Sequence, residues 1–283
     1  MSASYVGESD QVDLSKIECD PPHEVDRLSI DQKTDKLGEE LAELQDLMWG
    51  ARTRSVMIVL QGRDTAGKDG AIKKVVGFLN PRGVGVTSFG VPSTVEREHD
   101  YLWRVHEVAP RKGEVAVYNR SHYEDVLVVR VHNLVPEKRW QKRYRHIRDW
   151  EQLLVDEGTI VVKYFLHISK EEQKKRLLER EADPTKAWKL NRGDWEEREL
   201  WKEYTAAYED ALGKTASRQA PWIVVPANAK WYRNYLVTKG LVEALRPYRD
   251  EFEATLDERA VEKKAQLEEY KRQRAAAKAG GAK

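Results

Sequence analysis

The sequence is short of several features that would place a protein outside the cytosol. It has one cysteine, Cys19, so no disulfide can form within the chain, as in proteins of reducing compartments. Its apolar runs, such as residues 56–60, are far shorter than the roughly 20 residues that a membrane span needs. The polar N-terminus shows no signal-peptide pattern. We therefore expect a cytoplasmic protein with no membrane partner.

Net charge is also almost absent. The 49 lysines and arginines balance 48 aspartates and glutamates, which leaves a formal charge of +1. The overall charge therefore argues neither for nor against a polyanionic partner, and only the local distribution of basic residues can decide. We find no internal repeat, and 283 residues suffice for one large domain with additions.

Five short apolar segments alternate with stretches of helical periodicity. They span residues 56–60, 84–89, 114–118, 159–168 and 222–225. Among the helical stretches, a capping box at Ser93–Glu96 predicts a helix that reaches about Val108, and another long helix is expected over about 195–212. This alternation predicts an α/β fold in which helices flank both faces of a five-stranded parallel sheet. We expect one domain over residues 28–250, a loosely attached polar arm over 1–27, and a charged, helical tail over 251–283.

A glycine-rich loop follows the first apolar segment, in VMIVLQGRDTAGKDG (56–70). Gly62, Gly67 and Lys68 have the G-x-x-x-x-G-K spacing of a phosphate-binding loop between a strand and a helix. Backbone N–H groups of such a loop surround phosphate oxygens, the helix dipole favours anions, and the lysine adds positive charge. The predicted phosphate contacts are Gly62, Arg63, Thr65, Ala66, Gly67, Lys68 and Asp69.

Two acidic residues make this loop atypical. Asp69 stands where nucleotide-binding loops usually carry a magnesium-binding serine or threonine, and Asp64 lies inside the loop. A carboxylate there would repel phosphate unless a divalent cation lay between them. We predict Asp64 as a Mg²⁺ ligand and give Asp69 less weight, because an acid at a helix N-terminus is also favourable by itself.

A polar segment, VYNRSHYED (117–125), ends the third predicted strand. Arg120 at a strand's carboxyl end would point into the ligand crevice and can hold phosphate oxygens in a bidentate manner. Asn119 stands where many phosphate-loop proteins have an aspartate. Glu124 and Asp125 are either acids at a helix start or active-site carboxylates, and the sequence leaves both open. We assign His122 a structural hydrogen bond and no role as a general base.

Basic residues gather in two later segments. Residues 138–148 form a basic helix whose charges fall on several faces, so many of them should simply be solvated. Residues 184–194 (PTKAWKLNRGD) connect two predicted helices. A basic connection there suits a lid over about 184–200 that closes on phosphates, and an ordinary surface loop is the alternative.

Five separated motifs together resemble the second family of polyphosphate kinases. They are GRDTAGKDG (62–70), FGVPS (89–93), HDYLWR (99–104), YNRSHYEDV (118–126) and NRGDW (191–195). The resemblance covers about residues 30–250. The segment that begins YNRSHYED is most similar to class III of that family, whose members phosphorylate nucleoside mono- and diphosphates.

This resemblance implies a phosphate-loop kinase fold with a helical lid, Mg²⁺ as cofactor, and inorganic polyphosphate in place of ATP as donor. It implies that Asp64, Lys68 and Arg120 are catalytic, and that the lid carries Arg192 and Asp194. The predicted nucleotide contacts are Phe89, Pro92, Asn119, Glu124, Lys189, Arg192 and Asp194. The residues predicted to bind the polyphosphate chain beyond the loop are Arg130, Lys138 and Arg143.

The predicted activity is reversible, magnesium-dependent phosphoryl transfer between polyphosphate and AMP, ADP, GMP or GDP. We expect a homo-oligomer with no nucleic-acid partner. Two alternative functions would also be consistent with these residues. One is a conventional ATP-dependent kinase with the same loop and lid, and the other is a non-catalytic protein that binds polyanions through the basic helix.

Overall fold

One six-stranded sheet organises the chain in the computed structural model, which describes residues 3–8 and 10–280, without the side chains of 186, 187, 189 and 276–280. The strand order is β1-β6-β5-β2-β4-β3. The strands are β1 (Ser4–Val6), β2 (Ser55–Gly62), β3 (Val84–Ser88), β4 (Val115–Asn119), β5 (Thr159–His167) and β6 (Trp222–Pro226). Strands β2 to β6 are parallel, as the alternation of apolar and helical segments predicts.

The first residues are attached to the sheet, in contrast to the predicted loose arm. β1 pairs antiparallel with β6, with Ser4 opposite Val224, and the side chains of Val6 and Leu14 are buried. A strand of three residues is too short to show a period of two, so its polar surroundings dominate the sequence pattern. The arm thus covers one sheet edge.

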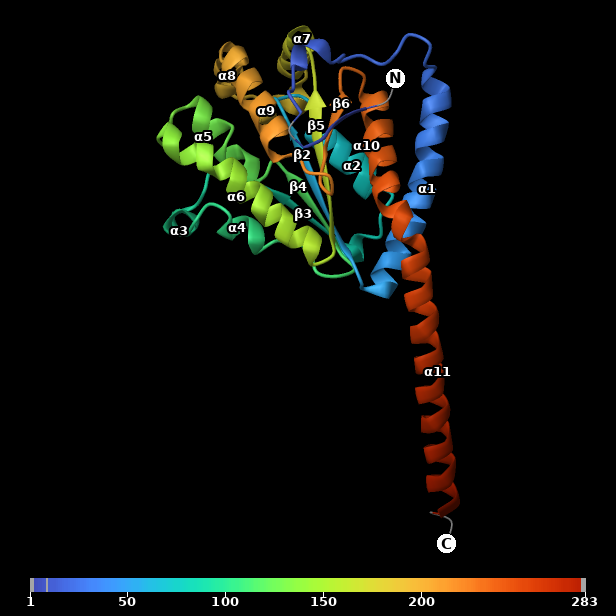
Figure 1. Cartoon of the computed structure of the whole chain (residues 1–283). Helices are drawn as coiled ribbons and strands as arrows, with labels where there is room; N and C mark the ends of the chain where they lie inside the picture. The colour runs from blue at the N-terminus through green and yellow to red at the C-terminus, as the bar shows by residue number, and fades with distance from the viewer. Residues whose placement is uncertain (1–2, 9, 281–283) are drawn as a thin grey trace.

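Helices cover both faces of the sheet (Figure 1). α1 (Arg27–Ala51), α2 (Lys68–Val76) and α10 (Lys230–Leu245) pack on one face. On the other face lie α6 (Glu137–Asp156) and α9 (Trp201–Thr215). The shorter helices are α3 (Thr94–Glu98), α4 (Trp103–His106), α5 (Val128–Val131), α7 (Lys170–Ala182) and α8 (Arg192–Glu199).

Two helices predicted as continuous are broken. The expected helix from Ser93 to about Val108 begins with the predicted capping box, since Ser93 and Glu96 bond each other's backbone N–H. It ends at His99, whose backbone is extended, and the Asp100 carboxylate accepts the Leu102 N–H to start a new turn. The expected helix over about 195–212 is likewise divided at Leu200 into α8 and α9.

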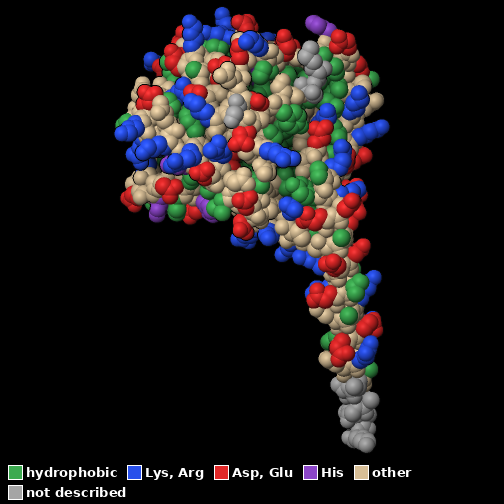
Figure 2. Space-filling view, in the orientation of Figure 1, with side chains coloured by type: hydrophobic (Ala, Val, Ile, Leu, Met, Phe, Trp, Pro, Cys, Tyr) green, Lys and Arg blue, Asp and Glu red, His purple; other side chains and the backbone are tan. Residues whose placement is uncertain are grey.

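The last helix, α11 (Arg249–Gly280), leaves the body of the molecule (Figure 1). Phe252 is buried and Leu256 lies against Gly50, whereas residues 257–275 are exposed. Acidic and basic side chains alternate along the projecting part (Figure 2). Within the described ranges, none of the helices combines the length and apolar character needed to cross a membrane.

The sheet topology places a crevice at the carboxyl end of β2. The chain passes from β2 to β3 and β4 on one side, then to β5 and β6 on the other. Ligands of open α/β sheets bind where the connections diverge in this way. The glycine-rich loop follows β2, and Arg120 directly follows β4, so both predicted elements border this crevice.

Candidate active site

The glycine-rich loop turns tightly before α2. Thr65 and Gly67 have left-handed backbones, with φ of 64° and 96°, and only glycine adopts this conformation without strain. Gly67 precedes the first helical residue, Lys68. The turn therefore presents the N-terminus of α2 to the crevice, as a phosphate site requires.

Lys68 lies at the centre of this loop. Its side chain is largely buried, and its ammonium donates hydrogen bonds to the carbonyl oxygens of Gly62 at 2.7 Å and Arg63 at 3.3 Å. Burial lowers the pKa of Lys68, and the Asp64 carboxylate opposes this shift. The lysine therefore closes the loop and holds a positive charge at the point where the motif predicts phosphate.

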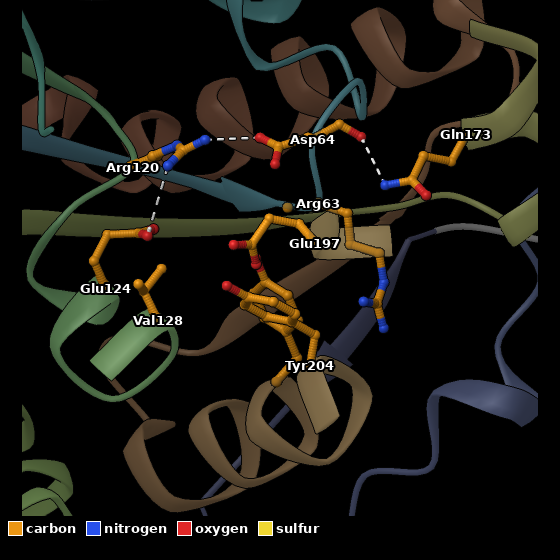
Figure 3. Close-up of a pocket in the computed structure, with 10 residues that line it drawn as sticks. Arg63, Asp64, Arg120, Glu124, Val128, Gln173, Glu197 and Tyr204 are labelled. Carbon is orange, nitrogen blue, oxygen red and sulfur yellow. Dashed lines mark hydrogen bonds and ion pairs between the residues drawn. The ribbon is translucent and has the colours of Figure 1, made fainter. Parts of the chain in front are cut away.

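Arg120 connects the end of β4 to the loop. Its backbone has a φ of 60°, and its N–H donates to the Leu60 carbonyl at 3.1 Å. A left-handed non-glycine residue costs about 1–2 kcal/mol, and such strain is concentrated at functional sites. The guanidinium donates to Asp64 Oδ1 at 2.7 Å and lies 3.9 Å from Glu124 Oε2 (Figure 3).

Glu124 faces the cavity beside the loop, and Asp125 does not. Glu124 lines a small cavity of about 40 Å³ beside Asp64 and Arg120 (Figure 3). Burial raises the pKa of its carboxyl, against the positive charges of Arg120 and Lys68. The neighbouring Asp125 instead accepts a hydrogen bond from buried Arg143 at 2.8 Å. Of the two acids that the sequence left open, Glu124 therefore faces the crevice.

A cleft of about 660 Å³ opens in front of the loop. Its volume lies within the range of small-molecule sites. It brings together many of the predicted residues, namely Asp64, Thr65, Gly67, Lys68, Asp69, Asn119, Arg120 and Asp194.

Asp69, Asn119 and Asp194 also have structural partners. The Asn119 amide donates to Asp69 Oδ1 at 2.9 Å, which ties β4 to the first turn of α2. Asp194 on α8 accepts from Arg180 on α7 at 2.5 Å. Burial and then the charge of Asp64 raise the pKa of Asp194. The segment predicted as a lid is therefore anchored at the cleft.

Two predicted phosphate contacts, Arg63 and Arg143, have guanidinium groups that bond other parts of the protein. Arg63 points away from Asp64 and Arg120 (Figure 3). Its guanidinium donates to the Trp201 carbonyl at 3.0 Å and to Thr205 Oγ1 at 2.5 Å, and it stacks 3.7 Å from the Trp201 ring. Arg143 is buried against Asp125 and is therefore not available to a polyphosphate chain. A sequence pattern cannot separate a buried arginine from an exposed one on the same helix.

The other predicted polyphosphate contacts lie away from the cleft. Arg130 donates to Tyr144 at 3.0 Å and to Asp210 at 2.6 Å, and Lys138 is exposed at the start of α6. Basic side chains gather over α5 and α6 (Figure 2), as expected for a solvated helix face.

Among the described side chains, the remaining predicted nucleotide and phosphate contacts do not line the cleft. Phe89 is buried, 5.1 Å edge-to-face from Tyr118, so its ring belongs to the core. Pro92 is half-buried, and its carbonyl accepts from Arg97. Arg192 is exposed and paired with Glu196 at 2.7 Å. The side chain of Lys189 lies outside the described set. Ala66 is buried, and its carbonyl accepts from Arg176 at 3.2 Å.

The cleft also contains basic residues that we did not predict as site residues. Arg176 and Arg180 come from α7, and Lys230 and Arg233 come from the first turn of α10. The available signal was a basic pair, three residues apart, at a helix start directly after the fifth parallel strand. Since that strand ends at the same edge of the sheet as the loop, this pair could have been assigned to the site.

The residues present fit a magnesium ion held through one protein carboxylate. Among the described residues, no group of three or more acidic, histidine or cysteine side chains is placed to hold a metal. Mg²⁺ needs no such cage in phosphoryl-transfer sites, because one or two carboxylates suffice with substrate phosphates and water. Asp64 lines both the cleft and the small cavity, so its carboxylate borders the space where phosphates would lie.

Comparisons with known proteins agree on one family. The family model described as Polyphosphate kinase 2 (PPK2) matches residues 24–253. An AMP/ADP-polyphosphate phosphotransferase of Meiothermus ruber is 56% identical over 74% of this chain and 78% of its own length. An ADP-polyphosphate phosphotransferase of Rhodopseudomonas palustris is 40% identical over 91% and 93%. The crystal structure of Polyphosphate Kinase 2 from Arthrobacter aurescens superposes with a TM-score of 0.82 at 37% identity, covering 87% of this chain and 92% of that one.

Proposed function

This chain belongs to the polyphosphate kinase 2 family, and from that premise we propose that its cleft transfers phosphoryl groups between inorganic polyphosphate and AMP or ADP. We include GMP and GDP as further acceptors. Transfer is reversible, because the bonds broken and formed are both phosphoanhydrides. The observation that supports this proposal best is the grouping of Asp64, Lys68 and Arg120 around one cleft at the carboxyl ends of β2 and β4.

Both reactants are polyanions, so their mutual repulsion is the main obstacle to in-line transfer. Lys68 and Arg120 place two positive charges beside the loop and stabilise the spread negative charge of a loose transition state. The acceptor is a phosphate that is already anionic, so no general base is required. His122 agrees with this, because it is fully buried and bonded to Glu151 at 3.1 Å.

We propose that Asp64 holds Mg²⁺. The bound ion would supply further neutralisation of the phosphate oxygens. Asp64 now accepts from Arg120, so the carboxylate has to share its oxygens between the guanidinium and the ion. We also propose that the region 184–200 closes over the phosphates as a lid, since α8 reaches the cleft through Asp194.

The test is product analysis by chromatography. AMP, ADP, GMP or GDP is incubated with polyphosphate and magnesium, with Lys68→Ala as the control. We expect the next higher phosphate of each nucleotide with the native chain and almost none with the variant. If polyphosphate is inert and ATP arises from ADP only with a second nucleotide, the chain is a conventional kinase. If neither chain forms a product and Lys68→Ala still binds polyphosphate as the native chain does, the non-catalytic alternative holds.

A further inference from the structure

Arg63 connects the phosphate loop to a distant helix. Its main chain belongs to the loop, where its carbonyl accepts from the Ala66 N–H at 3.0 Å and from the Lys68 ammonium at 3.3 Å. Its side chain points away from Arg120 (Figure 3) and reaches the first turn of α9. A single residue therefore joins the loop that is expected to hold phosphate and the helix that follows the lid segment.

Three contacts hold the Arg63 guanidinium on α9. The group lies 3.7 Å from the centre of the Trp201 ring, and Nη2 donates to the Trp201 carbonyl at 3.0 Å and to Thr205 Oγ1 at 2.5 Å. Only 9% of the Arg63 surface is exposed, and both acceptors are uncharged. Burial lowers the pKa of Arg63 to about 10, so it stays charged at neutral pH. Stacking together with two donated hydrogen bonds needs the planar guanidinium, which a lysine cannot replace.

These contacts lie where the lid segment ends. α8 ends before Leu200, and α9 begins at Trp201. Segments that close over a ligand turn about a few residues at the ends of helices or strands. The break at Leu200 has this position, because it separates α8, which reaches the cleft, from α9, which packs on the sheet.

A second set of hydrogen bonds runs from the loop to the other side of this break. The Gln173 amide donates to the Asp64 carbonyl at 3.3 Å, and Gln173 Oε1 accepts from Arg198 at 3.0 Å. Arg198 lies in the last turn of α8. Two consecutive loop residues, Arg63 and Asp64, are thus connected to both helices that meet at Leu200.

We propose that Arg63 is a positioning residue, which fixes the junction of α8 and α9 to the phosphate loop and so sets where the lid segment meets the cleft. The inference rests on the proposed function, because it concerns the segment 184–200. Asp194 of α8 lines the cleft, so its place there depends on this junction. The role differs from the phosphate contact that the sequence predicts for Arg63, since the guanidinium bonds α9.

Steady-state kinetics separate positioning from phosphate binding. Arg63→Met should lower kcat about tenfold or more at saturating polyphosphate and ADP, because a displacement of about 1 Å can cost about 10² in rate. Arg63→Lys keeps the charge without the planar group, so its kcat should fall to a similar degree. Full recovery of kcat with lysine would overturn the proposal, and so would a raised KM for polyphosphate at unchanged kcat.

Thr205→Val tests the same contact from α9. Valine keeps the shape of threonine and removes the hydroxyl that accepts from Arg63. The change should lower kcat in the native chain and have no further effect in Arg63→Met, because both variants break one contact. Effects that multiply in the double variant would contradict the proposal. Arg52→Met is the matched control and should behave as the native chain, since Arg52 also lies over a tryptophan ring, Trp49, but at the end of α1.

Distances between two spin labels measure the position of α8 directly. Cys19 is changed to serine, and labels are attached through Glu196→Cys on α8 and Asp149→Cys on α6, which are both exposed. The distance distribution should be broader with Arg63→Met than with Arg63, both in the free chain and with tripolyphosphate and magnesium. Equal distributions in the two chains would overturn the proposal. Absence of transfer by the native chain would contradict the proposed function, while the distances would still decide on Arg63.

Discussion

Lys68 and Arg120 approach the loop that carries Asp64 from two different elements of the fold. Lys68 begins α2 and bonds the carbonyls of its own loop, whereas Arg120 follows β4 and holds Asp64 at 2.7 Å. The two positive charges therefore stand in place before substrate binds. Such prior arrangement is what electrostatic stabilisation of a transition state requires, because no further reorganisation is needed during the reaction.

Lys68→Met should lower kcat by about 10²–10³, the usual effect of removing one preorganised donor from a developing charge. The methionine keeps the length of the side chain, so circular dichroism and the melting temperature should stay close to those of the native chain. Kinetics at saturating polyphosphate and ADP provide the measurement. An unchanged kcat with a raised KM alone would show that Lys68 only helps binding.

Asp64→Asn should raise the magnesium concentration needed for half-maximal activity by at least tenfold, because an amide is a much weaker magnesium ligand than a carboxylate. The variant also removes the charged partner of Arg120. Activity measured over a magnesium titration, at fixed total phosphate, provides the test. The same half-maximal concentration in both chains would mean that another group holds the metal.

The sequence predicts those residues of the candidate site that stand at a fixed distance from the end of a strand. Lys68, Asp64 and Arg120 each occupy a fixed place after a strand, so their grouping could be predicted. Arg63 and Arg143 have the same chemistry as Arg120 but are buried against Trp201 and Asp125, a difference that only packing determines. Arg233 approaches the loop from more than 160 residues away in the sequence.

At the scale of elements, a buried polar network holds the segment that follows β4. Lys163 of β5 donates to Glu151 of α6 at 2.6 Å and to the Thr215 carbonyl of α9 at 2.9 Å. Glu151 also accepts from Tyr123 at 2.7 Å and is bonded to His122 at 3.1 Å. His122 and Tyr123 follow Arg120 after one intervening residue, so the network fixes the segment next to this arginine.

Lys163→Met should destabilise the fold by about 3–5 kcal/mol, because it leaves Glu151 buried without its cation. Adding Glu151→Gln should restore part of this loss, since the uncompensated charge is then removed. Urea unfolding of the single and double variants measures both effects. A double variant that is less stable than Lys163→Met would show that hydrogen bonds, rather than charge, dominate this network.

The sequence predicts the boundary of a helix or strand where a local motif, such as a capping box, marks it. The Ser93 capping box is present as expected, yet the helix after it ends at His99. His99 stacks on Trp103 at 4.1 Å, a contact between side chains that periodicity does not indicate. β1 was missed for a related reason, since its three residues become a strand only by pairing with β6.

At the scale of the whole molecule, α11 extends far beyond the domain that carries the site (Figure 1). Its contacts with the body come from its first turns, with Phe252 buried and Arg259 donating to the Gly50 carbonyl at 2.6 Å. Removal of residues 263–283 should therefore leave kcat and the melting temperature unchanged. Light scattering of both chains also tests the predicted homo-oligomer. A fall in mass or in activity would assign the tail to assembly.

The most direct test of phosphoryl transfer follows the phosphate itself. Native chain is mixed with ³²P-labelled polyphosphate, unlabelled ADP and magnesium, and the nucleotides are separated. We predict labelled ATP without a matching rise in AMP, because the donor is polyphosphate. Unlabelled ATP accompanied by an equal amount of AMP would contradict this, since ADP would then be both donor and acceptor.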